Sequence, residues 1–182
     1  MKLWEKNQPP NKKIDHFTVG KDREYDLHLA PFDCQASIAH AQMLVKSGIL
    51  NLEEADKLVV VLNDLKNESE KGDFVIEAEF EDMHSKIEYV LTQKLGDLGK
   101  KIHTARSRND QVLVALHLYL KAEIETIKKL THSFFKLLMD LADHHKDKLL
   151  PGYTHFQVAM PSSFGLWFSA YAESLIDDVT LL

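Results

Sequence analysis

The sequence contains little of what several common protein classes require. Its 182 residues include one cysteine, Cys34, so no intrachain disulfide can form, which is typical of a reducing compartment. Lys and Arg total 22 against 28 Asp and Glu, and this formal charge of −6 argues against nucleic-acid binding. The longest aliphatic run, residues 58–62, is far too short to span a membrane, and residues 1–6 lack the apolar stretch of a signal peptide. We therefore expect a cytoplasmic protein that binds neither nucleic acid nor membrane.

Motifs for several kinds of chemistry are also absent. The sequence has no G-x-G-x-x-G or Walker motif for a nucleotide, and Ser107 lacks the G-x-S-x-G setting of a serine hydrolase. Ten histidines suggest a metal, but no H-E-x-x-H or Cys/His cluster occurs. The adjacent His144 and His145 would diverge by about 100° on a helix. We expect no metal site, and neither a dinucleotide nor a P-loop site is indicated.

Glycine and proline are scarce, and none occurs between Gly99 and Pro151. Within that stretch, apolar residues recur every three or four positions from Leu113 to Leu141, which predicts one helix of about 36 residues and about 54 Å. Helices of that length are typical of bundles and coiled coils. The structure should therefore be helical and elongated in part.

The remaining chain predicts shorter helices. Asn51 and Glu54 have the spacing of a capping box at the start of one of them, and Pro31 can occupy the first turn of another, with Gly48 beyond its end. Polar residues with Pro9-Pro10 and Gly20 predict an extended arm at the N-terminus. The predicted helices cover about residues 31–47, 51–70, 81–95 and 161–182, with a connection at 72–76 and an arm at 1–30.

The segment 101–111, K-I-H-T-A-R-S-R-N-D-Q, is the strongest candidate for binding chemistry. Arg106 and Arg108 would converge if the segment turns, and an arginine fork matches a carboxylate or phosphate. Asn109 or Asp110 can cap the long helix that follows, so its first amides would face the same anion. We expect a site for a negatively charged small molecule; the alternative is a well-capped, solvated helix entry.

His103 and His155 lie on short loops at the two ends of the long helix, each within two residues of a threonine. Either can be a structural hydrogen-bonding group or a group that exchanges protons near neutral pH. One copy of the helix would separate them by tens of ångströms. If both act on a substrate, the site must combine different copies of the chain.

Two segments, H-T-A-R-S-R-N-D-Q at 103–111 and P-G-Y-T-H-F-Q at 151–157, together resemble argininosuccinate lyases of the fumarase/aspartase superfamily. The segments D-x-x-x-S at 33–37 and E-D-x-H at 81–84 extend the resemblance, which covers about residues 25–182. It implies an all-α fold with a helical N-terminal domain followed by the first long helices of a fumarase/aspartase-type bundle. We expect an arm at 1–30, the small domain at 31–108 and the start of the bundle at 109–182.

The same resemblance implies a homotetramer that cleaves argininosuccinate to arginine and fumarate in arginine synthesis, without a metal or organic cofactor. Three subunits would contribute to each site. By position, His155 matches the catalytic histidine and Arg108 a carboxylate-binding arginine. Candidate substrate-binding residues are Ser37, Asn109, Thr154, His103 and Gln157.

Some positions depart from the family pattern. Ala105 replaces a glycine, which is costly if that position has positive φ, Val158 and Met160 alter the segment after His155, and His117 ends a stretch that replaces T-D-L-R. The family's serine loop would lie beyond residue 182, so we expect the chain alone to be inactive and to expose an apolar stripe. Alternatives are a non-catalytic, crystallin-like scaffold and a sister lyase that releases fumarate from another substrate.

Overall fold

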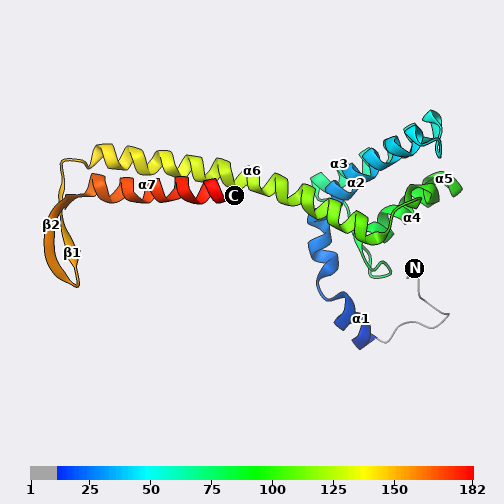
Figure 1. Cartoon of the computed structure of the whole chain (residues 1–182). Coiled ribbons are helices and arrows are strands. Elements are labelled where there is room, and N and C mark those ends of the chain that lie inside the picture. Colours follow the sequence, from blue (N-terminus) through cyan, green and yellow to red (C-terminus); the bar gives the residue numbers. More distant parts are fainter. Residues whose placement is uncertain (1–11) are drawn as a thin grey trace. The chain divides into compact units, whose positions relative to one another are not determined.

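The computed structural model describes residues 12–182 and forms two compact units, Met1–Leu120 and Lys121–Leu182 (Figure 1). The predicted domain boundary between residues 108 and 109 remains a prediction. The elements are α1 Lys12–Val19, α2 Asp22–Lys46, α3 Leu52–Lys71, α4 Met83–Leu95, α5 Asp97–Lys100, a 3-10 turn at Lys101–His103, α6 Arg108–His144, β1 Leu149–Thr154, β2 Gln157–Ser163 and α7 Phe164–Leu181.

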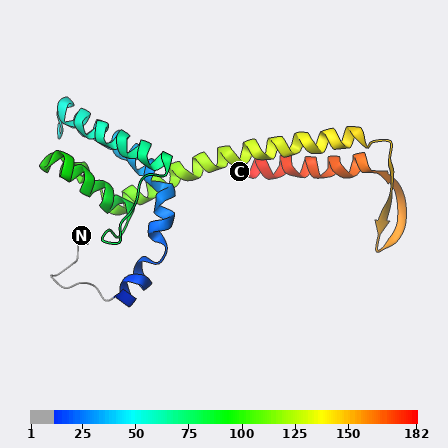
Figure 2. The ribbon, with the colours of Figure 1, turned by 180° about the vertical axis from the view of Figure 1, so that it is seen from behind.

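The core of the first unit lies between α2, α3 and α4, which pack on one another (Figure 2). The predicted capping box of α3 is confirmed, because Asn51 Oδ1 accepts from the Glu54 N–H at 2.8 Å and Glu54 Oε2 accepts from the Asn51 N–H at 3.0 Å. The apolar side of the helix is buried as its spacing indicates. Its fully or nearly fully buried members are Ala55, Leu58, Val61, Leu62 and Leu65.

The N-terminal part of α2 corrects two predictions. Residues 12–19 and 22–30 are helical rather than extended, and Pro31 lies inside α2 rather than in its first turn. Residues 1–11 of the predicted arm lie outside the described residues. Tertiary bonds outweigh the missing proline N–H, because Arg23 donates to two backbone carbonyls before α4 and Asp26 Oδ2 accepts from the Met83 N–H at 2.9 Å.

The long helix is confirmed: α6 has 37 residues. Its beginning contributes to the first unit, where Ala115 belongs to the core and the Tyr119 ring packs edge-on against Phe32 at 5.8 Å. Cys34 is fully buried in the same core. Burial raises the pKa of its thiol well above the ordinary value, and the charge of Asp33 acts in the same direction.

The second unit contains a hairpin that the sequence did not predict. Residues 149–163 were expected to be a loop followed by a helix from about Pro161, but they form antiparallel strands β1 and β2, and α7 begins only at Phe164. His155 and Phe156 form a two-residue turn with φ of 47° and 61°. Such turns normally use Asn or Gly, so this one lacks the usual sequence signal.

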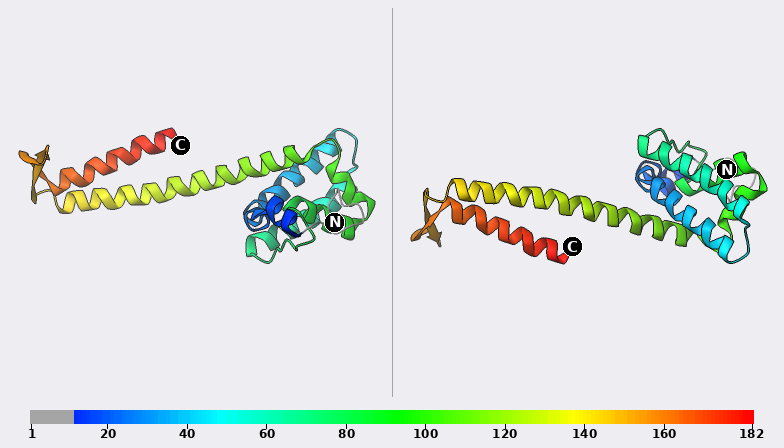
Figure 3. Two further views of the ribbon diagram at one scale, coloured as in Figure 1. Left: turned by 90° about the horizontal axis from the view of Figure 1, so that it is seen from below. Right: turned by 90° about the horizontal axis from the view of Figure 1, so that it is seen from above.

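After the hairpin, α7 runs back along the second half of α6 (Figure 3). The helices approach closely at Gly165, where an added Cβ would lie 2.8 Å from the Ala142 carbonyl oxygen. Further along, the two helices line a mostly apolar hollow of about 280 Å³ that includes Phe135 and Leu175. Large apolar side chains of α6 and α7 are exposed, in agreement with the predicted apolar stripe. They include Ile127, Leu130, Phe134, Leu137, Leu166, Trp167, Tyr171 and Ile176.

Candidate functional site

The segment between the 3-10 turn and α6 turns sharply at Ala105, which has φ 60°. The sequence analysis noted that replacing glycine there is costly if φ is positive, and φ is positive. The Thr104 carbonyl oxygen lies 2.9 Å from Nε2 of His40 on α2, and this contact holds the turn against α2. Because a carbonyl oxygen only accepts, His40 donates this bond through Nε2. Burial lowers the pKa of His40.

The entry to α6 is capped by Ser107, not by Asn109 or Asp110 as predicted. Ser107 Oγ accepts from the Asn109 N–H at 3.1 Å, and Asp110 Oδ2 accepts from the Ser107 N–H at 2.7 Å. This reciprocal pair resembles a capping box with Asp in place of Glu. The Ser107-x-x-Asp110 spacing was the available sequence signal. The Asn109 side chain remains exposed.

The two arginines of the segment diverge instead of converging. Arg106 points to α2, where Nη1 and Nη2 each donate to Ser37 Oγ at 3.1 Å. Arg108 points to α4 and donates through Nη1 to Glu88 Oε1 at 3.2 Å. The expectation that both forks close around one anion is therefore wrong, because each guanidinium already has its own protein partner.

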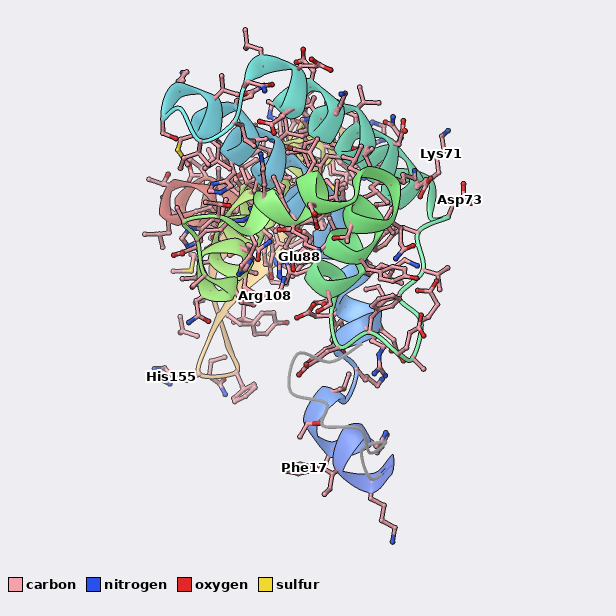
Figure 4. All side chains as sticks on the ribbon, turned by 90° about the vertical axis from the view of Figure 1, so that its right-hand side faces the viewer. Phe17, Lys71, Asp73, Glu88, Arg108 and His155 are labelled. Atoms are coloured by element: carbon pink, nitrogen blue, oxygen red, sulfur yellow. The ribbon has the colours of Figure 1, made fainter. Side chains whose placement is uncertain are left out.

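Arg108 lies at a small hollow that also contains the predicted His103. Figure 4 shows Arg108 beside Glu88, which lines the same hollow. The hollow has a volume of about 200 Å³. Besides Arg108, its lining contains two side chains that are or can become positively charged, Lys100 and His103, and one carboxylate, Glu88. The charge of the lining therefore suits an anionic group. The hollow is lined by Glu88, Thr92, Lys100, His103 and Arg108.

Asp33 and His84 form a buried polar pair whose carboxylate acts electrostatically on Arg106. Asp33 is fully buried, and its Oδ1 lies 3.1 Å from His84 Nδ1, although the two atoms lack hydrogen-bond geometry. Burial lowers the pKa of Arg106, while the charges of Asp33 and Glu88 oppose that shift. The charge of Asp33 thus favours the charged form of Arg106, and Arg106 holds Ser37, which is itself 1% exposed.

The remaining predicted site residues lie at the tip of the hairpin in the second unit. Thr154 and Gln157 form its last register pair, and His155 begins the turn between them. All three are exposed. Phe156 beside them is 98% exposed, an unusual setting for an aromatic side chain.

The structure thus gathers Ser37, His103, Arg108 and Asn109 around one loop of the first unit and puts Thr154, His155 and Gln157 on the hairpin of the second. The sequence analysis did not identify Glu88. Glu88 lies one turn after His84 on the same side of α4, but this spacing points to the site only when α4 is known to face the loop. The sequence analysis also missed the Arg106–Ser37 bond.

Metal-binding clusters and membrane-spanning helices are both absent from residues 12–182. Those residues contain no group of three or more His, Cys, Asp and Glu side chains placed to hold a metal ion. None of the helices they form is long and apolar enough to cross a membrane.

The fold is that of the fumarase/aspartase-type helical lyases. The chain is similar to the structure described as fumarate lyase:delta crystallin from Brucella melitensis, with a TM-score of 0.74, 16% identity and coverage of 96% of this chain and 45% of that one. It is also similar to an EDDS lyase variant with bound fumarate, with a TM-score of 0.73, 21% identity and coverage of 96% and 34%. The all-α prediction is confirmed, with the two-stranded hairpin as a minor addition.

The family profile described as Lyase matches residues 5–182, and the chain belongs to this family. It is 54% identical to the argininosuccinate lyase of Phocaeicola vulgatus over 181 residues, which are 100% of this chain and 41% of that protein. It is 44% identical to the argininosuccinate lyase of Thermotoga neapolitana, covering 100% of this chain and 46% of that protein. The chain therefore spans less than half the length of these curated relatives.

Proposed function

We propose that the chain supplies the N-terminal, carboxylate-binding part of an argininosuccinate lyase. The reaction is β-elimination of argininosuccinate to arginine and fumarate, in arginine biosynthesis in the cytoplasm. The observation that carries this proposal is the hollow at Arg108, in a chain that is 54% identical to an argininosuccinate lyase.

The elimination needs donors for the substrate carboxylates and groups that move protons. Arg108 binds a carboxylate, and His103 and the exposed amide of Asn109 bind near it. Ser37 Oγ accepts from Arg106 and keeps its own hydroxyl proton to donate. These groups hold the end of the substrate on which negative charge develops.

His155 is the proposed catalytic residue, with Thr154 and Gln157 as neighbouring substrate contacts. A continuous helix of 37 residues, about 55 Å long, runs between Arg108 and the hairpin. In the proposed site, the residues around Arg108 come from one copy of the chain and those around His155 from another copy, within a homotetramer.

A chimaera tests this function. Residues 1–182 replace the matching part of the Phocaeicola vulgatus lyase, and fumarate release from argininosuccinate is followed by ultraviolet absorbance. We expect turnover, and we expect His155→Asn to reduce it by at least about a hundredfold, the usual contribution of a proton-transferring side chain. The control His144→Asn, at an exposed position on α6, should leave turnover unchanged.

The other outcomes separate the alternatives. A folded, assembled chimaera without turnover on any substrate would favour a crystallin-like scaffold, and faster turnover of adenylosuccinate would favour a sister lyase. The 182-residue chain by itself should release no fumarate.

A further inference from the structure

Glu88 contacts two candidate ligand-binding groups through one oxygen atom. Its Oε1 lies 3.1 Å from His103 Nδ1 and 3.2 Å from Arg108 Nη1. The nitrogen and oxygen atoms of the His103 contact lack hydrogen-bond geometry, but a carboxylate oxygen at this distance repels a nitrogen lone pair, which favours a proton on His103 Nδ1. In the neutral ring, this leaves Nε2 as an acceptor, and Nε2 has no partner among residues 12–182.

The same contact determines which edge of Arg108 is open. Nη1 also donates to Gln111 Oε1 at 3.2 Å, so both of its hydrogens are used. Nη2 has no hydrogen-bond partner within the described part of the chain. Nε is 3.9 Å from Asp82 Oδ2, too far for a hydrogen bond. The Nε–Nη2 edge, with two parallel N–H groups, therefore remains for a bidentate carboxylate.

We infer that Glu88 is the positioning residue of the carboxylate site: by one oxygen it turns the Nε–Nη2 edge of Arg108 and the Nε2 atom of His103 toward ligand. This inference rests on the proposed function. Glu88 and Arg108 are about one-quarter exposed, so their contact is less screened by water than a surface ion pair. Glu88 itself does not touch the substrate.

The first experiment uses the 182-residue chain and requires no activity. Nitrogen-labelled NMR at mildly alkaline pH reports the His103 tautomer and the exchange of the Arg108 Nε proton. In the wild type we expect the Nδ1–H tautomer. Glu88→Met removes the acceptor at similar size and should give the Nε2–H form that free histidine prefers, together with a mobile Arg108. Glu88→Gln keeps an uncharged acceptor and should retain part of the wild-type signature.

Glu70→Met is the matched control, because Glu70 lies on α3 in an exposed ion pair with Lys66. It should leave both NMR signatures unchanged, and circular dichroism should show equal helix content in all variants. An unchanged His103 tautomer in a folded Glu88→Met chain would overturn the inference.

The second experiment measures steady-state kinetics in the chimaera. Losing the orientation of Arg108 should raise KM for argininosuccinate about tenfold, the scale of one hydrogen bond to a charged group, with a smaller change in kcat. Glu88→Gln should recover part of the loss. If the chimaera is inactive, the proposed function fails, whereas the NMR result still decides the role of Glu88. A normal KM in the Glu88→Met chimaera would contradict the inference.

Discussion

The two arginines of the α6 entry differ in their surroundings. Arg106 is influenced by the charge of the buried Asp33 and donates through both terminal nitrogens to Ser37, so it holds the loop to α2. Arg108 lies at a hollow and keeps one edge open. The two arginines are two residues apart whether they converge on one ligand or bind separate protein partners. The sequence could therefore identify both as candidates but could not show which of them stays open to a ligand.

At the residue scale, we predict a pH-dependent loss of stability through His40. Burial lowers its pKa in the folded chain, and the charges of Arg106 and His103 add to this effect, while the Thr104 bond opposes it. Below the ordinary value of 6.5 the unfolded chain binds the proton more readily, so stability present at higher pH is lost as the pH falls.

The measurement is denaturant unfolding from about pH 7.5 to about pH 5.5, the range in which histidine titrates. The free energy of unfolding of the wild type should fall more steeply than that of His40→Gln, which keeps a donor for Thr104. The difference in slope cannot exceed about 1.4 kcal/mol per pH unit, the limit for one proton. Parallel pH profiles would refute this role.

At the element scale, helices with clear end signals were predicted well, and elements decided by distant contacts were not. The α3 capping box and the length of α6 follow from local spacing. The start of α2 depends on Arg23 and Asp26 bonding to the segment before α4, which no local pattern reveals. The hairpin depends on a turn at His155 and Phe156 that lacks the usual residues.

The junction between α4 and α5 provides a prediction at this scale. A Cβ on Gly99 would lie 2.4 Å from the backbone carbonyl of Leu91, and neither helix can yield without moving its backbone. Gly99→Ala should therefore lower the free energy of unfolding by about 2 kcal/mol or more, by overpacking. Urea unfolding followed by circular dichroism measures this loss.

Gln93→Ala is the control for this substitution, because Gln93 is exposed on α4. It should change stability by less than about 0.5 kcal/mol. If Gly99→Ala behaved like this control, the close approach of the two helices would be wrong.

At the scale of the whole molecule, the second unit leaves much apolar surface uncovered. Leu130 is 66% exposed and Phe134 is 52% exposed on the same side of α6. Contiguous apolar surface of this kind usually marks an interface. We therefore predict that the 182-residue chain associates with itself.

Sedimentation velocity should give an average mass above the 20.9 kDa of one chain, rising with concentration. The double variant Leu130→Glu, Phe134→Glu should shift the distribution to monomer without loss of helix content, because both positions are exposed. Lys136→Glu changes the charge at an exposed position on another side of the same helix and should not affect association. A wild type that is monomeric at all concentrations would contradict the prediction.

The burial of Cys34 has a practical consequence for studying assembly. Because the one native thiol, Cys34, is buried and its pKa is raised, it should react little with a maleimide dye or spin label. A cysteine introduced at the exposed position of Gln157 or Asn109 would therefore be labelled selectively. Paired labels of this kind would allow the spacing between the hairpin tip of one copy and the arginine loop of another to be measured directly by energy transfer or dipolar spectroscopy.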